Sequence, residues 1–277
     1  MQTLRPMLAL AMAALAVPAG AVTNVTVQLG INPNFSGGTG PVNPVVTQAG
    51  PAELTSGLVT GGFNSTGTGH VWADIGAIKV DGSSSGSLNS VARGIYRDDF
   101  RIDLAGMPAG TQVKLDFTLN LSGTLSVNDH NEATAAWLVA ADMGGGAYDL
   151  GASGHLYNNS PIFAMHGYVG DAIGPLHGTA LVPTGQWLPM SVELTASAQT
   201  GYDNGSDTTP GASAFDFSHT LTWGGMTVSL NGVQQNDAQV SSGSGLNYLQ
   251  PLAVPEPGTG LLIGLGASFL LWRRRQA

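Results

Sequence analysis

The segment QVKLDFTLNL, residues 112–121, decides the fold class of this chain of 277 residues. Large apolar side chains occupy every second position in it, and polar or charged side chains occupy the positions between them. The apolar positions are Val113, Leu115, Phe117, Leu119 and Leu121. A period of two places these side chains on one face of an extended strand, whereas a helix would spread them around its axis. The segment therefore predicts a strand with one buried face and one solvated face.

The same alternation recurs along the chain and sets the architecture. Further strong runs lie at 100–104, 190–196, 215–223 and 226–230, and weaker strands are expected at 24–29, 54–60, 71–80, 134–141 and 162–169. The last strong run ends at Asn231-Gly232, a favoured pair for a two-residue hairpin turn. Gly, Pro and Asn predict loops at 30–52 and 200–213. Strands with one wet face form antiparallel sheets that pack face to face, so we expect an all-β, jelly-roll-like antiparallel β-sandwich.

The composition excludes several classes of protein. The chain contains 40 Gly and 15 Pro, which weighs against a helical fold, and only 10% of its residues are charged. Between residues 22 and 254, five cations face seventeen acids, which gives this part a formal charge of −12. Five cations can neutralise only a few phosphates, so a nucleic acid partner is not expected. The absence of Cys excludes disulfides, thiolate metal sites and cysteine catalysis.

The first 21 residues are predicted to be a secretory signal peptide. Arg5 supplies the positive charge, and an uncharged apolar run, MLALAMAALAV, follows at residues 7–17 as the signal helix. Pro18 ends this run, and Ala19 and Ala21 are the small residues that signal peptidase accepts before its cleavage site. The sequence therefore predicts export, with a mature chain that begins at Val22.

The C-terminal end has three parts in a fixed order. The motif Val-Pro-Glu-Pro-Gly at 254–258 precedes an apolar segment at 259–272, and Arg273, Arg274 and Arg275 follow. Fourteen residues span about 21 Å as a helix, less than the roughly 30 Å of a hydrocarbon core. However, no charge interrupts the segment, and a cluster of arginines is typical of the cytoplasmic end of a membrane span. We therefore expect a short transmembrane helix at 259–272, with the arginines reaching the membrane surface.

This order of parts resembles the PEP-CTERM sorting tail of exported Gram-negative proteins, which an exosortase processes. The resemblance covers residues 254–277 and implies transient lodging in the inner membrane, cleavage near Pro255, Glu256 and Pro257, and release or attachment at the cell surface. Proteins with this tail accompany exopolysaccharide production and biofilm formation. The tail is also labelled an ice-binding protein C-terminal domain, although the body lacks the regular threonine array that ice binding needs. The expected domains are therefore 1–21, an ectodomain at 22–253 and the tail at 254–277.

The body offers no coherent catalytic constellation, so we expect a non-enzymatic surface or matrix component. Ser84 lies in a Gly-x-Ser-x-Gly pattern at 82–86, but this pattern belongs to a parallel α/β sheet, and a Ser/Gly-rich loop explains it here. Asp98 and Asp99 are an adjacent carboxylate pair, and the arginines on either side of them predict a charge-balanced sheet edge. The alternative is a secreted hydrolase that acts on polysaccharide or lipid and uses one of these groups.

Two kinds of ligand remain open. Trp187, predicted to lie in a loop, is the candidate platform of a sugar-binding module, whereas Trp137 and Trp223 lie in strand patterns and are expected in the core. Calcium is the cofactor that the sequence leaves open, because two acidic turns supply oxygen ligands. Their ligands would be Asp203, Asn204 and Asp207 in one turn and Asp129 and Glu132 in the other. The alternative is that these carboxylates stay hydrated.

Overall fold

The computed structural model describes residues 23–33, 43–60, 65–128, 133–144, 148–157, 160–164, 174–200 and 211–252. Within these ranges the chain forms strands and turns and no helix. The predicted signal peptide at 1–21 and the predicted membrane helix at 259–272 lie outside the described residues. Among the residues that are described, none forms a helix that is long and apolar enough to cross a membrane.

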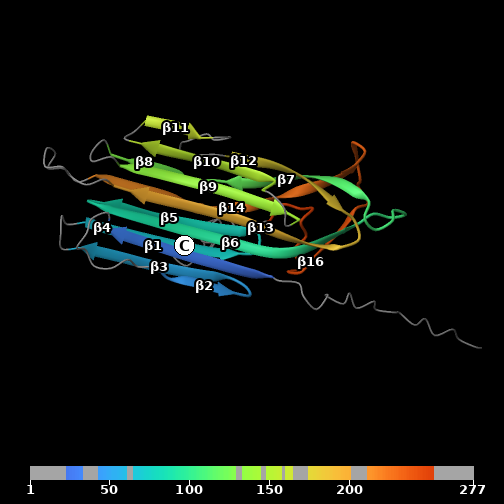
Figure 1. Cartoon of the computed structure of the whole chain (residues 1–277), viewed down its shortest axis with the longest axis horizontal. Helices are drawn as coiled ribbons and strands as arrows, with labels where there is room; N and C mark the ends of the chain where they lie inside the picture. The colour runs from blue at the N-terminus through green and yellow to red at the C-terminus, as the bar shows by residue number, and fades with distance from the viewer. Residues whose placement is uncertain are drawn as a thin grey trace, which may run out of the picture.

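Two antiparallel sheets of eight strands each make up the described body (Figure 1). Sheet A runs in the order β11 (Ser160–Ala164), β10 (Leu150–Tyr157), β9 (Thr134–Met143), β13 (Trp187–Gln199), β6 (Leu88–Asp103), β1 (Asn24–Pro33) and β2 (Val45–Gln48), and β16 (Gln239–Ser242) also pairs with β6. Sheet B runs in the order β12 (Gly174–Pro183), β7 (Gln112–Leu121), β14 (Ala212–Leu230), β5 (Ala77–Ser85), β4 (Ser65–Asp74) and β3 (Ala52–Thr60). Two short strands, β8 (Thr124–Val127) and β15 (Val233–Gln234), also pair with β14.

One hydrophobic core lies between the sheets and contains the apolar face of β7. The five apolar residues of this strand are at most 2% exposed, as its alternation predicts. Phe117 stacks on Trp223 of β14 with ring centroids 5.9 Å apart, and Tyr248 packs edge-on against the same indole at 5.0 Å. The predicted all-β fold of antiparallel sheets is therefore confirmed. Each sheet has eight strands, so the body has more strands than a jelly roll, which has eight in total. The predicted likeness to the connectivity of a jelly roll stays a prediction.

Several predicted limits of strands and loops are wrong. The expected strand at 71–80 is split by a turn at Ile75-Gly76, where Gly76 has a φ of 85°, so that β4 and β5 form a hairpin. The expected loop at 30–52 contains the end of β1 and all of β2. The expected loop at 82–86 is mostly the end of β5. There Ser83 and Ser85 exchange hydroxyl hydrogen bonds with threonines of β4, which compensates for the low strand propensity of serine and glycine.

The runs at 215–223 and 226–230 belong to a single strand, β14. Its pairing with β7 shifts register between Trp223 and Met226, where a bulge accommodates Gly224 and Gly225. The predicted hairpin turn at the end of β14 is confirmed, since Asn231 and Gly232 have φ angles of 52° and 79°. Positive φ at both central residues is the requirement of a type I′ turn, which matches the twist of the flanking strands.

Gly178 tests the packing of this core. It lies opposite Phe117 in the β12–β7 pair, and a Cβ placed on it would come within 2.1 Å of the Phe117 ring. Because Phe117 is held against Trp223, Gly178→Ala should lower the free energy of unfolding by about 2 kcal/mol, measured by chemical denaturation. Gly151→Ala is the matched control, because nothing lies within 4 Å of its Cβ position. Equal stability of the two variants would contradict this packing.

Candidate functional site

Asp98 lies in the interior of the sandwich, although the sequence predicted a charge-balanced edge. This prediction is wrong because β6 lies between β1 and β13 in sheet A, and the Asp98 side chain is 1% exposed. Five donors hydrogen-bond its carboxylate: the hydroxyls of Thr23 (3.0 Å), Ser244 (2.5 Å) and Tyr248 (2.7 Å), and the backbone amides of Asp99 (2.9 Å) and Ser244 (3.0 Å). A buried carboxylate with this set of partners is a structural group, not an accessible acid or base.

The Asp98 site joins the two ends of the described body. Thr23 opens the first described segment, and Tyr248 belongs to the last. The Tyr248 carbonyl accepts hydrogen bonds from the indole of Trp223 at 2.8 Å and from the amide of Met226 at 3.0 Å. Leu252, the last described residue, donates its amide to the Trp223 carbonyl at 2.9 Å. The chain is therefore fastened to the core up to Leu252.

Two buried tyrosines, Tyr96 and Tyr248, lie near Asp98, and the Tyr248 hydroxyl donates to its carboxylate. Burial raises the pKa of Tyr248 far above its usual value, and its neighbours Tyr96 and Asp98 raise it further. Burial also raises the pKa of Tyr96, with a smaller contribution from the charge of Asp98. The Tyr248 hydroxyl therefore stays protonated and donates a hydrogen bond to the Asp98 carboxylate.

Ser84 occupies an interior position on β5. It is 1% exposed, and its hydroxyl donates to the carbonyl of Leu88 at 2.7 Å and lies 3.2 Å from the hydroxyl of Thr200. A strained strand-to-helix turn presents the nucleophile in the Gly-x-Ser-x-Gly elbow, whereas Ser84 sits within a regular antiparallel strand. The structure thus brings neither Asp98 nor Ser84 to a surface that a substrate reaches.

The remaining predicted ligand residues separate into two groups. Trp187 is the first residue of β13, paired with Arg101 and half-buried, so its predicted position in a loop is wrong. The expected core positions of Trp137 and Trp223 are confirmed. The calcium candidates Asp203, Asn204, Asp207, Asp129 and Glu132 lie outside the described residues, and calcium binding stays a prediction. Among the residues described, no group of three or more acidic or histidine side chains is arranged to hold a metal ion.

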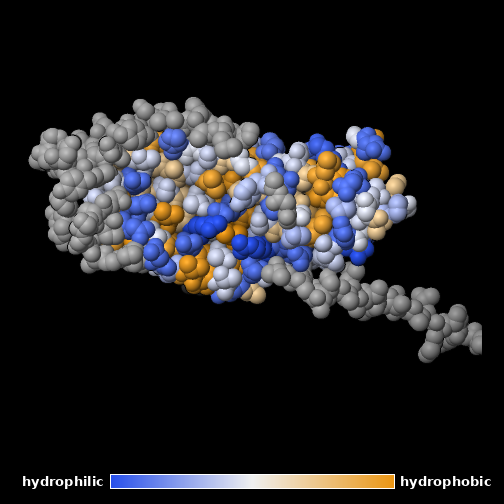
Figure 2. Space-filling view, viewed as in Figure 1, coloured by the Kyte–Doolittle hydropathy of each residue, from blue (hydrophilic) through white to orange (hydrophobic). Residues whose placement is uncertain are grey.

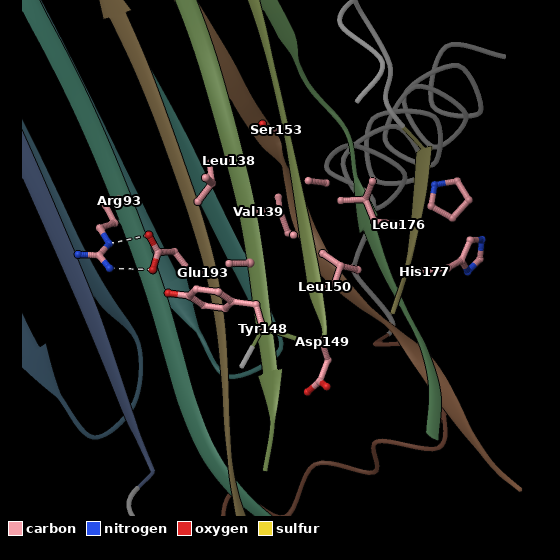
Figure 3. Close-up of a pocket in the computed structure, with 14 residues that line it drawn as sticks. Arg93, Leu138, Val139, Tyr148, Asp149, Leu150, Ser153, Leu176, His177 and Glu193 are labelled. Carbon is pink, nitrogen blue, oxygen red and sulfur yellow. Dashed lines mark hydrogen bonds and ion pairs between the residues drawn. The ribbon is translucent and has the colours of Figure 1, made fainter. Parts of the chain in front are cut away.

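A cleft of about 780 Å³ opens beside the outer face of sheet A (Figure 3). Its lining comes from strands β6, β9, β10 and β13 of sheet A, from Tyr148 and Asp149 before β10, and from Pro175, Leu176 and His177 of β12. Its most exposed apolar side chains are Tyr148, which is 72% exposed, and Leu138, which is 43% exposed. Figure 3 shows the Tyr148 ring beside Glu193, with its hydroxyl directed toward the Arg93–Glu193 pair.

Arg93 and Glu193 form the polar centre of this cleft. The guanidinium donates from Nε and Nη2 to the two carboxylate oxygens, at 2.8 and 2.7 Å. The hydrogen bond to Glu193 raises the pKa of Arg93, although partial burial opposes this shift. Thr195 also donates its hydroxyl to Glu193, at 2.9 Å. This bidentate geometry fixes both side chains and presents donors and acceptors together.

Tyr148, Leu138 and the Arg93–Glu193 pair were not predicted from the sequence, where only tryptophans were taken as candidate aromatic platforms. One signal was available: Tyr148 follows three consecutive glycines at 144–146, a context typical of a surface turn. Arg93 and Glu193 are 100 positions apart along the chain. Their pairing cannot be predicted without the register of β6 and β13.

A second polar cluster lies on the outer face of sheet B, on β3, β4 and β5. His70 bonds Asp81 through Nδ1 at 2.7 Å and Glu53 through Nε2 at 2.9 Å. Partial burial lowers the pKa of His70, but the hydrogen bonds to Asp81 and Glu53 and the charges of these carboxylates together raise it above 6.5. The protonated imidazole therefore cross-links three neighbouring strands.

This cluster predicts a pH dependence of stability. Because the folded-state pKa of His70 is raised, its contribution is fully present below about pH 6.5 and is lost as the pH rises through the folded-state pKa. Denaturation of the wild type and of His70→Gln should show the larger difference at pH 5.5 and a smaller one at pH 8.5. At these half-exposed positions the effect should stay below about 1 kcal/mol. A difference that is larger at pH 8.5 would contradict the assignment, and His177→Gln is the control.

Asp98 should stabilise the contact between the first and the last described segments of the body. Asp98→Ala leaves several buried donors without an acceptor, so it should lower the free energy of unfolding by about 3 kcal/mol or more, measured by chemical denaturation. It should also expose the segment at 243–252 to proteases. Asp103→Ala, which removes a half-exposed ion pair with Arg101, is the matched control and should cost less than about 1 kcal/mol. Similar losses in the two variants would refute the structural role of Asp98.

The comparison with protein families concerns the chain directly beyond Leu252. Residues 253–275 match the model of the PEP-CTERM protein-sorting motif. No curated protein sequence matches the chain. The motif, which the sequence resemblance predicted, indicates an exported protein that is processed at the membrane by an exosortase-type enzyme. The chain is thus a folded all-β body that carries a PEP-CTERM protein-sorting motif at its C-terminal end.

Proposed function

We propose that this protein is a non-enzymatic component of the cell surface or extracellular matrix that associates with exopolysaccharide. The observation that carries the proposal is the position of the sorting motif. It begins at residue 253, directly after Leu252, whose amide donates a hydrogen bond to the Trp223 carbonyl in the core. A body that is closed up to the motif is suited to be delivered intact by removal of the tail.

Both expected processing sites lie outside the described residues, each within five positions of a described residue that hydrogen-bonds to the core. Removal of residues 1–21 would leave Thr23 in place to bind Asp98. Cleavage near Pro255, Glu256 and Pro257 would leave the bond between Leu252 and Trp223 intact. In this proposal signal peptidase and an exosortase-type enzyme act in turn on a precursor that the inner membrane holds transiently. The product then reaches the cell surface or the medium with the hydrogen bonds of Thr23 and Leu252 intact.

The non-enzymatic role rests on the two candidate groups for hydrolysis. Asp98 and Ser84 are both buried, and both are used in hydrogen bonds that connect distant parts of the chain.

Figure 2 shows hydrophilic and hydrophobic residues interspersed over the face of the body in view, which suits contact with a hydrated polymer. The alternative is a secreted hydrolase, and turnover of a polysaccharide or lipid that Asp98→Asn or Ser84→Ala abolishes in a folded variant would establish it.

The sorting fate is tested by intact mass. Protein recovered from the cell surface or medium should begin at Val22 and lack every residue after Pro257. A variant with Arg273, Arg274 and Arg275 all replaced by Gln should lose the charge that stops the tail at the membrane. Its processed form should fall by about tenfold or more, whereas Arg97→Gln in the body, the control, should be processed normally. A wild-type protein that still carries Trp272 at its final location would overturn the proposal.

A further inference from the structure

We propose that the cleft beside the outer face of sheet A binds a neutral oligosaccharide, with Tyr148 as the stacking platform and the Arg93–Glu193 pair as the hydroxyl-binding group. The inference rests on the proposed association with exopolysaccharide and assigns it a surface and a ligand class. The cleft volume of about 780 Å³ lies within the roughly 300–1,000 Å³ typical of small-ligand sites.

The floor of the cleft contains two small residues that lie in register beside Glu193, one on β9 and one on β10. Glu193 of β13 lies opposite Ala140 of β9, and Ala140 lies opposite Gly151 of β10. A Cβ at Gly151 would meet nothing within 4 Å, so the space above this row is open. The neighbouring row contains the larger Leu138, between Thr195 and Ser153. The sheet surface is therefore stepped, with a low row beside a higher one.

Tyr148 supplies an exposed flat surface at this step. It is 72% exposed, and Leu138, also lining the cleft, is 43% exposed. An aromatic ring in water presents an apolar face together with a polar hydroxyl, which suits a ligand that has both kinds of surface. A pyranose ring is such a ligand, because its axial C–H groups form an apolar face and its hydroxyls project from the edge.

The Arg93–Glu193 pair matches the edge of such a ring. The bonds to Glu193 use Nε and Nη2 of the arginine, which leaves the Nη1 hydrogens to donate to a hydroxyl oxygen. The Glu193 oxygens have further lone pairs that accept from a neighbouring hydroxyl. Because the salt bridge already fixes both side chains, binding orders few additional rotamers.

The charges around the cleft favour a neutral ligand. Glu193 already compensates the charge of Arg93, and the cleft also contains the Asp149 carboxylate. The body as a whole carries a formal charge of −12. An anionic polymer would therefore be repelled, whereas a neutral chain of sugars would not.

A second hollow extends the site along the sheet and indicates an oligomer. It has a volume of about 310 Å³ and shares Leu138 and Ser153 with the first. Thr195, Ser197 and His155 line it, all of which form hydrogen bonds with hydroxyl groups. Successive sugar units would occupy the two hollows on either side of Leu138.

The test is a titration of the exported, processed protein with cellohexaose and maltohexaose, followed by NMR or affinity electrophoresis. At least one of these neutral probes should bind. Tyr148→Ala should weaken its binding tenfold or more, and Tyr148→Phe, which keeps the ring, should stay within about threefold of the wild type. Gly151→Val should also weaken binding tenfold or more, because its side chain would occupy the space of the ligand. The variant should still fold, since nothing lies within 4 Å of the Cβ position. Leu181→Ala, at a 75% exposed position of β12, is the control and should bind as the wild type.

Three results would overturn the site. The first is the absence of binding to both neutral probes by a folded wild type. The second is wild-type binding by Tyr148→Ala and Gly151→Val, which would place the ligand elsewhere. The third is binding of oligogalacturonate that equals or exceeds that of the neutral probes. None of these results alters the intact mass of the processed protein, so failure of the site is distinguishable from failure of the sorting fate.

Discussion

The closure of this body depends on one buried carboxylate. A charged group in the interior is tolerated only when hydrogen bonds replace its hydration, and Asp98 takes those bonds from the beginning and the end of the described chain. The same contacts place Tyr248 against Trp223, which stacks on Phe117 at the centre of sheet B. The polar closure and the aromatic core therefore support each other, and the sorting motif follows directly outside them.

The sandwich also explains where a ligand surface can form. Because alternate residues of each strand face the core, the outer positions of sheet A are free to differ from strand to strand. Long polar side chains stand on β6 and β13, and small residues stand on β9 and β10, so the outer face is stepped at Ala140 and Gly151. The rigid sheet thus fixes Arg93 and Glu193, and Tyr148 lies two residues before the start of β10.

The alternation of apolar residues predicted the fold class, the face of β7 that is buried and the hairpin at Asn231-Gly232. The same alternation places Asp98 on the buried face of β6, together with Phe100 and Ile102. The expected strand began only at residue 100, so the burial of Asp98 was not predicted. Strands rich in Gly and Ser were missed because their pairing is stabilised by neighbours and not by their own propensity. Thr23, Ser244 and Tyr248 lie 75, 146 and 150 positions from Asp98 along the chain, and local patterns do not predict such contacts.

Amide hydrogen exchange of the processed protein tests the closed body most directly. The amides of Ser244, Met226 and Leu252 donate to Asp98, Tyr248 and Trp223. If the body is closed up to the motif, these three amides should exchange only in step with global unfolding, and the amides of the central strand β7 should do the same. Exchange at the rate of an unstructured peptide, while β7 stays protected, would show that the C-terminal segment is open and would contradict the account.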